Sequence, residues 1–227
     1  MVLGSRKKGQ DHIIFVNRGA NEHISPDKKI FQKLECQWIF ISSLHGKDWV
    51  KTMDIIFQAA KEKHIKIAWN PGSSQLALGK KKLEKYLSQT SVLLVNKDEA
   101  IELALSGIKL GKRDPKFLNK PVFLLNILND WGPKTVVITL GKKGAVALKE
   151  GKFYNKKVIN KKVVDTTGVG DAFGGAFIAG LMHEGEDINK ALLWGIINSS
   201  YVVTKEGAHN GVLTKNELLS IAKKMYG

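Results

Sequence analysis

The sequence predicts a three-layer α/β/α fold built on a mainly parallel sheet, and three observations lead to this prediction. Strand-like apolar runs alternate with amphipathic helix patterns along most of the chain. The 227 residues are 43% hydrophobic and 25% charged, which is ordinary for a folded domain and enough for one sizeable core. Polar or glycine-rich turns follow the apolar runs, where open parallel sheets bind ligands. We therefore expect one α/β domain over residues 1–227.

The strand candidates are short apolar runs bounded by turn residues, and each of the first five precedes a helix pattern or a polar turn. They are His12–Val16, Trp38–Ile41, Ile65–Trp69, Val92–Val95 and Thr135–Thr139, followed by a hairpin of Gly144–Leu148 and Lys152–Tyr154. This rhythm predicts parallel βαβ units. The helix candidates begin near residues that favour a first turn. They lie at 48–63, 75–88, 97–105, 120–131, 169–184, 187–203 and 214–225, the last with a capping box of Thr214 and Glu217.

Composition excludes several classes of protein. The formal net charge is +15, but the lysines form small clusters spread through the chain and are not interleaved with aromatic residues on one element. This pattern predicts a solvated basic surface and no nucleic-acid site. No apolar run is long enough to span a bilayer, and the start lacks a secretory signal, so we expect a cytoplasmic protein. The single cysteine, Cys36, cannot form an internal disulfide, and we expect a packed, inert thiol.

The stretch Asp165-Thr-Thr-Gly-Val-Gly-Asp171 opens directly into an apolar helix pattern. Successive backbone amides at a helix N-terminus, with the positive end of the helix dipole, favour phosphate and charge that develops during phosphoryl transfer. Asp171 lies in the first turn. A carboxylate beside a phosphate site suits a general base that acts on a neighbouring hydroxyl, but it also suits an ordinary helix-start residue. The residues alone leave these two interpretations open.

Two further turns carry candidate site residues. Asn96 and Glu99 follow the run 92–95 and have the spacing of a capping pair, which satisfies free amides at a helix start. The functional alternative has Glu99 holding Mg²⁺ through water while Asn96 contacts phosphates. The turn Thr139-Leu-Gly141 with its two following lysines is a weaker candidate for receiving nucleotide phosphates. The glycines at 168–174 are spaced one residue too widely for a dinucleotide fingerprint, which argues against a nicotinamide-dependent oxidoreductase.

These motifs together resemble the ribokinase-like, or PfkB-type, carbohydrate kinases. The segment 165–177 is similar to the C-terminal signature of that family, with Val169 where alanine is more usual. Supporting matches occur in the order of the family: they are Gly19-Ala-Asn21, Ile24-Ser-Pro26, Asn70-Pro71, Asn96-x-x-Glu99, Thr139-Leu-Gly141 and Lys205-Glu-Gly-Ala208. The resemblance covers nearly the whole chain and implies a ribokinase-like fold that transfers phosphate from ATP to a hydroxymethyl group of a sugar or nucleoside.

The resemblance also implies roles at matching positions. Asp171 is implied as the catalytic base, and the amides of Gly168, Val169 and Gly170 as the anion hole. Asn96 and Glu99 are implied to organise the phosphates and Mg²⁺, with Thr139 and Gly141 beside the phosphates. The adenine is implied to lie beside 204–211, which includes Gly207, and beside Asn198. A monovalent cation such as K⁺ is implied at Asp165 with the carbonyl groups of Thr167, Val202, Lys205 and Gly207.

The chain departs from the family pattern at its beginning. Members of the family open with several dozen more residues, which carry a glycine-rich substrate motif and a small β-sheet lid over the sugar. We therefore expect this chain to hold the nucleotide-binding and catalytic portion without the N-terminal strands and lid. Uncovered strand edges predict poor solubility or association with another chain, with a homodimer as the expected form. A nucleotide-binding fragment or partner subunit of a split kinase, without catalysis, is the alternative function.

Overall fold

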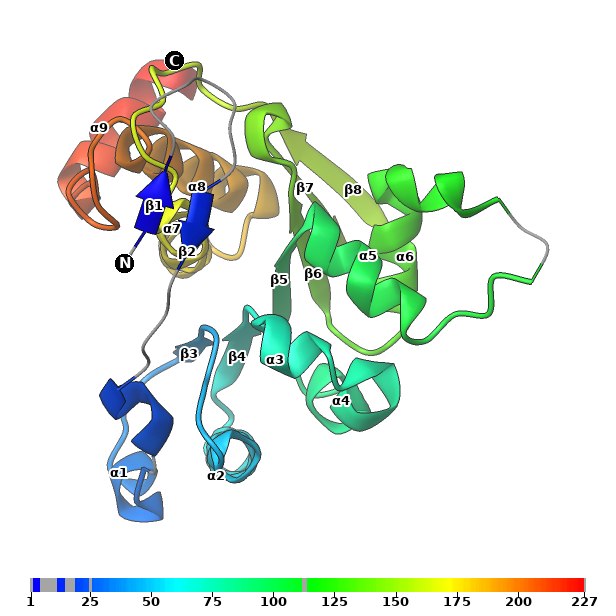
Figure 1. Ribbon diagram of the computed structural model, residues 1–227. Coiled ribbons are helices and arrows are strands. Elements are labelled where there is room, and N and C mark those ends of the chain that lie inside the picture. The colour runs from blue at the N-terminus through cyan, green and yellow to red at the C-terminus, as the bar shows by residue number, and fades with distance from the viewer. Residues whose placement is uncertain (1, 5–11, 15–18, 25, 112–113, 227) are drawn as a thin grey trace.

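The computed structural model describes residues 2–4, 12–14, 19–24, 26–111 and 114–226 (Figure 1). Its main sheet has six strands in the order β3-β4-β5-β6-β7-β8. The strands are β3 (Trp38–Ile41), β4 (Lys66–Trp69), β5 (Val92–Asn96), β6 (Thr135–Thr139), β7 (Ala145–Lys149) and β8 (Lys152–Lys156). The first four pair in parallel, and β7 and β8 continue the sheet as an antiparallel hairpin. The predicted three-layer fold on a mainly parallel sheet is confirmed, and the hairpin makes the sheet mixed.

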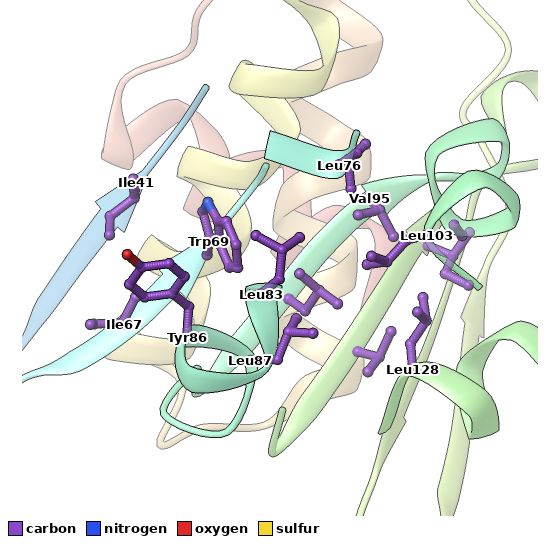
Figure 2. Packing of buried hydrophobic residues seen from close by; sticks show 14 of the residues in the cluster. Ile41, Ile67, Trp69, Leu76, Leu83, Tyr86, Leu87, Val95, Leu103 and Leu128 are labelled. Atoms are coloured by element: carbon purple, nitrogen blue, oxygen red, sulfur yellow. The ribbon is translucent and has the colours of Figure 1, made fainter. Parts of the chain in front are cut away.

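Helices cover both faces of this sheet (Figure 1). One face carries α2 (Trp49–Glu62), α3 (Ser73–Leu76), α4 (Gly79–Leu87), α5 (Lys97–Leu105) and α6 (Pro121–Asn129). Apolar side chains of these helices form the larger core with alternate strand residues such as Trp69, Leu93 and Ile138. Figure 2 shows Trp69 and Tyr86 in this core, with Leu83 and Leu87 beside them. The alternation of strand side chains between two buried faces explains why the strands read as nearly continuous apolar runs.

The other face carries α7 (Val169–His183) and α8 (Ile188–Val202). These two helices pack closely because Gly180 leaves room: a Cβ there would lie 2.9 Å from Ala191 Cα. Gly174 likewise lies against the ring of Phe40 from β3. The last helix, α9 (Lys215–Tyr226), packs outside α8 through Leu218 and Ala222. The position of α7 against the sheet fixes where its N-terminus lies relative to the strand ends.

Several sequence expectations need correction. His12–Ile14 is a strand, β2, but it pairs antiparallel with β1 (Val2–Gly4) in a separate two-stranded sheet and is not part of a parallel βαβ unit. Residues 15 and 16 lie outside the described part. The helix expected at 75–88 is divided into α3 and α4, because Gly79 adopts a positive φ of 72° that a continuous helix does not contain. Val163 and Val164 form no strand and are exposed.

The remaining differences concern short or exposed segments. Cys36 is exposed, because the approach to β3 lies on the surface and not in the core. The sequence patterns also missed four short elements whose few turns give no clear periodicity. These are η1 (Gly19–His23), α1 (Lys28–Gln32), η2 (Pro115–Asn119) and η3 (Gly141–Lys143). Among the described residues, no helix has the length and apolar character required to span a membrane.

Candidate active site

The carboxyl ends of the parallel strands meet at one edge of the sheet and bring predicted site residues together. Asn96 at the end of β5 lies opposite Thr139 at the end of β6 in the strand register. Both line a small pocket of about 90 Å³ together with Asn70, Glu99 and Gly170. Three strand ends and the first turn of α7 therefore converge on one pocket, as the βαβ pattern predicts.

Asn96 and Glu99 form the predicted capping box at the start of α5. The Asn96 side chain accepts from the Glu99 amide at 2.9 Å, and the Glu99 carboxylate accepts from the Asn96 amide at 2.8 Å. Burial raises the pKa of Glu99, although the hydrogen bond from Asn96 opposes this rise. The structural interpretation of this pair is thus confirmed, and the same two residues also face the pocket at the strand ends.

The glycines at the start of α7 differ in their surroundings. Gly168 caps the helix with a φ of 73°, and a Cβ there would lie 2.5 Å from Ala208 O, so this position requires glycine. A Cβ on Gly170 would meet nothing within 4 Å. Between them, Val169 N donates a long bond of 3.4 Å to Thr166 O. The first turn of a helix carries amides without partners inside the helix, and at Gly170 open space lies in front of that turn.

Asp171 is exposed and lies in the first turn of α7. Its Oδ1 accepts a hydrogen bond of 3.1 Å from the hydroxyl of Ser42, the residue that follows β3. Asp171 lines a hollow of about 440 Å³ that Gly170 does not line, together with Gly175, Ala208 and Asn198. Two successive residues of one turn therefore border different spaces, with the carboxylate on the side of the β3 end.

A larger cavity of about 490 Å³ adjoins the start of α7. Predicted residues Thr139, Gly141, Val169 and Gly170 line it. The rest of its wall is mainly apolar and, apart from Lys142 and Gly144 after Gly141 and Thr166 in the stretch 165–171, was not predicted from the sequence. It comprises Lys142, Gly144, Val158, Ile159, Asn160, Lys161, Val163, Thr166, Phe173, Ile196, Ser199, Ser200 and Val203. The spacing of Ile196, Ser199 and Ser200 places them on one face of α8, and Val203 follows at the end of the helix. The signal in the sequence was the presence of small polar residues on an otherwise apolar helix face.

Asn198, which the resemblance placed beside the adenine, does not line this cavity. Its amide nitrogen donates to Ala172 O of α7 at 2.9 Å, and its amide oxygen accepts from Leu213 N at 2.9 Å. The side chain is 4% exposed and lines the hollow beside Asp171, not the cavity lined by Thr139 and Gly141. Asn198 therefore fixes α8 to α7 and to the segment before α9, and the structure does not bring it to that cavity.

Asp165 joins two loops. One carboxylate oxygen accepts from the Thr167 amide at 2.9 Å and the Thr167 hydroxyl at 2.8 Å, and the other accepts from Gly207 N at 2.9 Å. The amide of Thr167, then that of Gly207, lowers the pKa of Asp165. Lys205 N donates to Val202 O at 3.1 Å at the end of α8. The residues predicted for a monovalent cation thus lie in connected segments, where Asp165 accepts hydrogen bonds from backbone amides.

Comparison with known proteins identifies the family. Residues 2–215 match the model of the pfkB family of carbohydrate kinases, and the chain belongs to that family. Ribokinase from Haemophilus influenzae is 28% identical over 214 residues, which are 93% of this chain and 65% of that protein. The chain thus spans slightly less than two thirds of the length of this relative.

Solved structures share the fold. The ribokinase of Arabidopsis thaliana, complexed with ribose and ATP, has a TM-score of 0.73 and 21% identity, with 96% of this chain and 67% of that chain covered. A proposed ribokinase II from E. coli, in complex with ATP and Mg²⁺, has a TM-score of 0.71 and 21% identity, with 94% and 68% covered. At this level of identity the likeness concerns the fold alone.

Proposed function

We propose that the chain carries the nucleotide-binding and catalytic portion of a kinase that transfers the terminal phosphoryl group of ATP to a hydroxymethyl group of a sugar or nucleoside. One observation carries the proposal: the first turn of α7 separates two kinds of space. Gly170 lines both the cavity and the small pocket at the strand ends, while Asp171, the next residue, lies beside Ser42 on the other side. A phosphoryl group at this turn would have the nucleotide on one side and a base on the other.

In this proposal, Asp171 takes the proton of the substrate hydroxyl. The hydroxyl oxygen of the substrate then bonds to the terminal phosphorus of ATP, and ADP leaves. The amides at Gly168, Val169 and Gly170 stabilise the negative charge on the transferring group. Thr139 and Gly141 border the phosphates of ATP. The family resemblance implies that 204–211 with Asn198 borders the adenine, but Asn198 and Ala208 line the hollow beside Asp171 and not the cavity. We therefore propose the cavity, which reaches Val203 just before this segment, as the adenine site, without Asn198.

The residues at the strand ends fit Mg²⁺. Among the described residues, no group of three or more histidine, cysteine or acidic side chains is placed to hold a metal ion. Mg²⁺ does not require one, because it usually keeps several waters and binds one or two carboxylates plus substrate phosphates. Glu99 supplies a partly buried carboxylate beside Asn96 and Thr139, all oxygen donors. When bound, Mg²⁺ would neutralise charge on the phosphates.

We also propose a K⁺ ion at the segments joined by Asp165. Replacing K⁺ with a tetraalkylammonium salt tests this site, because turnover should fall if the ion is required.

The test of the proposed function is Asp171→Asn, assayed with ATP, Mg²⁺ and a panel of sugars and nucleosides. We expect turnover to fall by roughly 10²- to 10⁴-fold, the usual contribution of a general base, while the affinity for ATP changes less than about threefold. The control is Asp48→Asn, which removes one negative charge at the start of α2, where no side-chain cap is present. Turnover near the parental rate in Asp171→Asn shows that Asp171 is not the base.

The same assay separates catalysis from the alternative of nucleotide binding alone. Calorimetry measures ATP binding to the parent chain in the presence of Mg²⁺, and the sugar panel measures turnover. Binding without turnover on every substrate favours a fragment or partner subunit that binds nucleotide without phosphorylating a substrate.

A further inference from the structure

Ser200 carries a buried hydroxyl without a hydrogen-bond partner in the described part of the chain. The residue is 2% exposed and lines the 490 Å³ cavity. A buried polar atom that lacks a hydrogen bond destabilises a protein by about 1–3 kcal/mol, so such atoms are rare in folded proteins. One other side-chain atom of the described residues shares this condition, Trp69 Nε1, which lies in the larger core (Figure 2). Of these two residues, Ser200 lines a cavity in which a ligand fits, and rotation about its side-chain torsion would turn the buried hydroxyl toward that space.

The helix itself does not provide the usual partner. A serine in a helix commonly donates to the carbonyl four residues earlier, which for Ser200 is Ile196 O. Ser199 Oγ already donates to Ile196 O at 3.2 Å. Ser200 has only one side-chain torsion, so a ligand in the cavity can receive or offer a hydrogen bond without rearrangement of the helix.

The chemistry of the cavity wall indicates which part of a nucleotide lies near Ser200. Thr139, Gly141 and Gly170, at a strand end and a helix start, suit the anionic phosphates. Val163, Ile196 and Val203 form apolar wall, which suits the faces of a planar base. A base in an apolar site still has polar ring edges that require partners. Ser200 supplies a hydroxyl within this apolar part of the wall.

We propose that Ser200 Oγ hydrogen-bonds the polar edge of the nucleobase and is a specificity-determining residue for the phosphate donor. This inference rests on the proposed function, because it takes the cavity as the nucleotide site. The Ser200 hydroxyl then has two opposite effects: it destabilises the nucleotide-free protein and strengthens nucleotide binding. A serine with a purely structural role has neither effect in this combination.

The test is Ser200→Ala in the full chain, with calorimetry of ATP and of inorganic tripolyphosphate, which has the phosphates without the base. We expect ATP to bind about 3- to 10-fold more weakly, the worth of one neutral hydrogen bond, and tripolyphosphate to change less than about twofold. The melting temperature without nucleotide should be equal to or above that of the parent. The matched control is Thr90→Val, which removes a buried hydroxyl that donates to Tyr86 O at 2.8 Å. This control should lower the melting temperature and leave ATP affinity unchanged.

The outcomes are distinguishable. A parent chain that binds no ATP removes the proposed function and the Ser200 assignment with it. A parent that binds ATP, with an equal affinity in Ser200→Ala, overturns only the assignment. Equal weakening of ATP and tripolyphosphate, or a lower melting temperature in Ser200→Ala, also overturns it, because either result means that the hydroxyl acts on the protein and not on the base.

Discussion

Gly168 and Gly170 are two residues apart, yet their surroundings make opposite demands on a substitution. Gly168 has a left-handed backbone and contacts Ala208, whereas Gly170 lies in the helix with open space before it. A side chain at Gly168 is therefore strained within the protein. A methyl group at Gly170 is tolerated by the protein and intrudes only on what occupies the space.

We expect Gly168→Ala to lower the free energy of unfolding by at least about 1–2 kcal/mol, from the left-handed conformation alone. Gly170→Ala should leave this free energy unchanged or raise it by up to about 1 kcal/mol, because alanine favours helix. The same variant should reduce ATP affinity, because Gly170 lines both spaces proposed for the nucleotide. Urea unfolding and calorimetry measure the two quantities. Unchanged ATP affinity in Gly170→Ala contradicts a phosphate site at this turn.

Glu99 has two roles that one substitution can separate. Glutamine at the third helical position still accepts from the amide of Asn96, so Glu99→Gln should change the free energy of unfolding by less than about 0.5 kcal/mol. Loss of the carboxylate should raise the Mg²⁺ concentration for half-maximal activity by roughly tenfold, as expected for a ligand that acts through water. Because burial raises the pKa of Glu99, protonation should also increase the Mg²⁺ requirement of the parent as pH falls.

The control for Glu99→Gln is Glu217→Gln in the capping box of α9. There the carboxylate of Glu217 accepts from the Thr214 amide at 2.8 Å, in the same arrangement. This variant should match Glu99→Gln in stability and leave the Mg²⁺ requirement unchanged. If Glu99→Gln and Glu217→Gln require the same Mg²⁺ concentration, Asn96 and Glu99 form only a helix cap and do not bind Mg²⁺.

At the scale of elements, Asp165 connects the segment before α7 to the loop after α8. The carboxylate form accepts the amides of Thr167 and Gly207, and these bonds lower the pKa of Asp165. A lowered pKa means that this contribution to stability is fully present above the ordinary value of 3.8 and is lost as pH falls through the folded-state pKa. The connection between the two loops should therefore weaken in acid.

Asp165→Asn should lower the free energy of unfolding by about 1 kcal/mol at pH 7, because its amide group cannot accept from both segments. The difference from the parent should shrink as pH falls below the ordinary value of 3.8 and through the lowered pKa of Asp165. Urea titrations between pH 3 and 7 measure it. Asp187→Asn at the start of α8 is the control, because asparagine caps a helix about as well as aspartate. A difference that does not vary with pH contradicts this role of Asp165.

The elements that the sequence predicted well are those with strong local signals. The runs 92–95 and 135–138 are strand residues buried on both faces, and the run 38–41 is a strand at the sheet edge that is mostly half-buried. The capping boxes at Asn96 and Thr214 follow from spacing alone. The part of the cavity wall formed by 158–163 and α8 was not predictable, because this irregular segment meets the helix only through tertiary packing. The contact of Ser42 with Asp171 spans 129 positions, and no local pattern records it.

At the scale of the whole molecule, the faces of the sheet are covered but one of its edges is open. The larger core covers one face from β3 to β7, and α7 and α8 cover the other face. β3 lies at one edge, and among the described residues no strand pairs with its outer side. The carbonyls of Gln37 and Ile41 accept from β4, so in a parallel ladder the backbone groups of Trp38 and Phe40 face outward. Both side chains are only partly buried.

An open apolar edge of this kind promotes pairing with other chains, which was the reason to expect poor solubility. Trp38→Glu should raise the protein concentration at which light scattering begins by severalfold. The new carboxylate faces Lys66 across the strand pair and places a charge on the edge. Lost packing of the indole should lower the free energy of unfolding by about 1 kcal/mol. Val122→Glu is the matched control: it adds the same charge at a side chain that is 51% exposed on α6, away from any sheet edge. If both variants raise the scattering threshold equally, net charge governs association and the β3 edge does not.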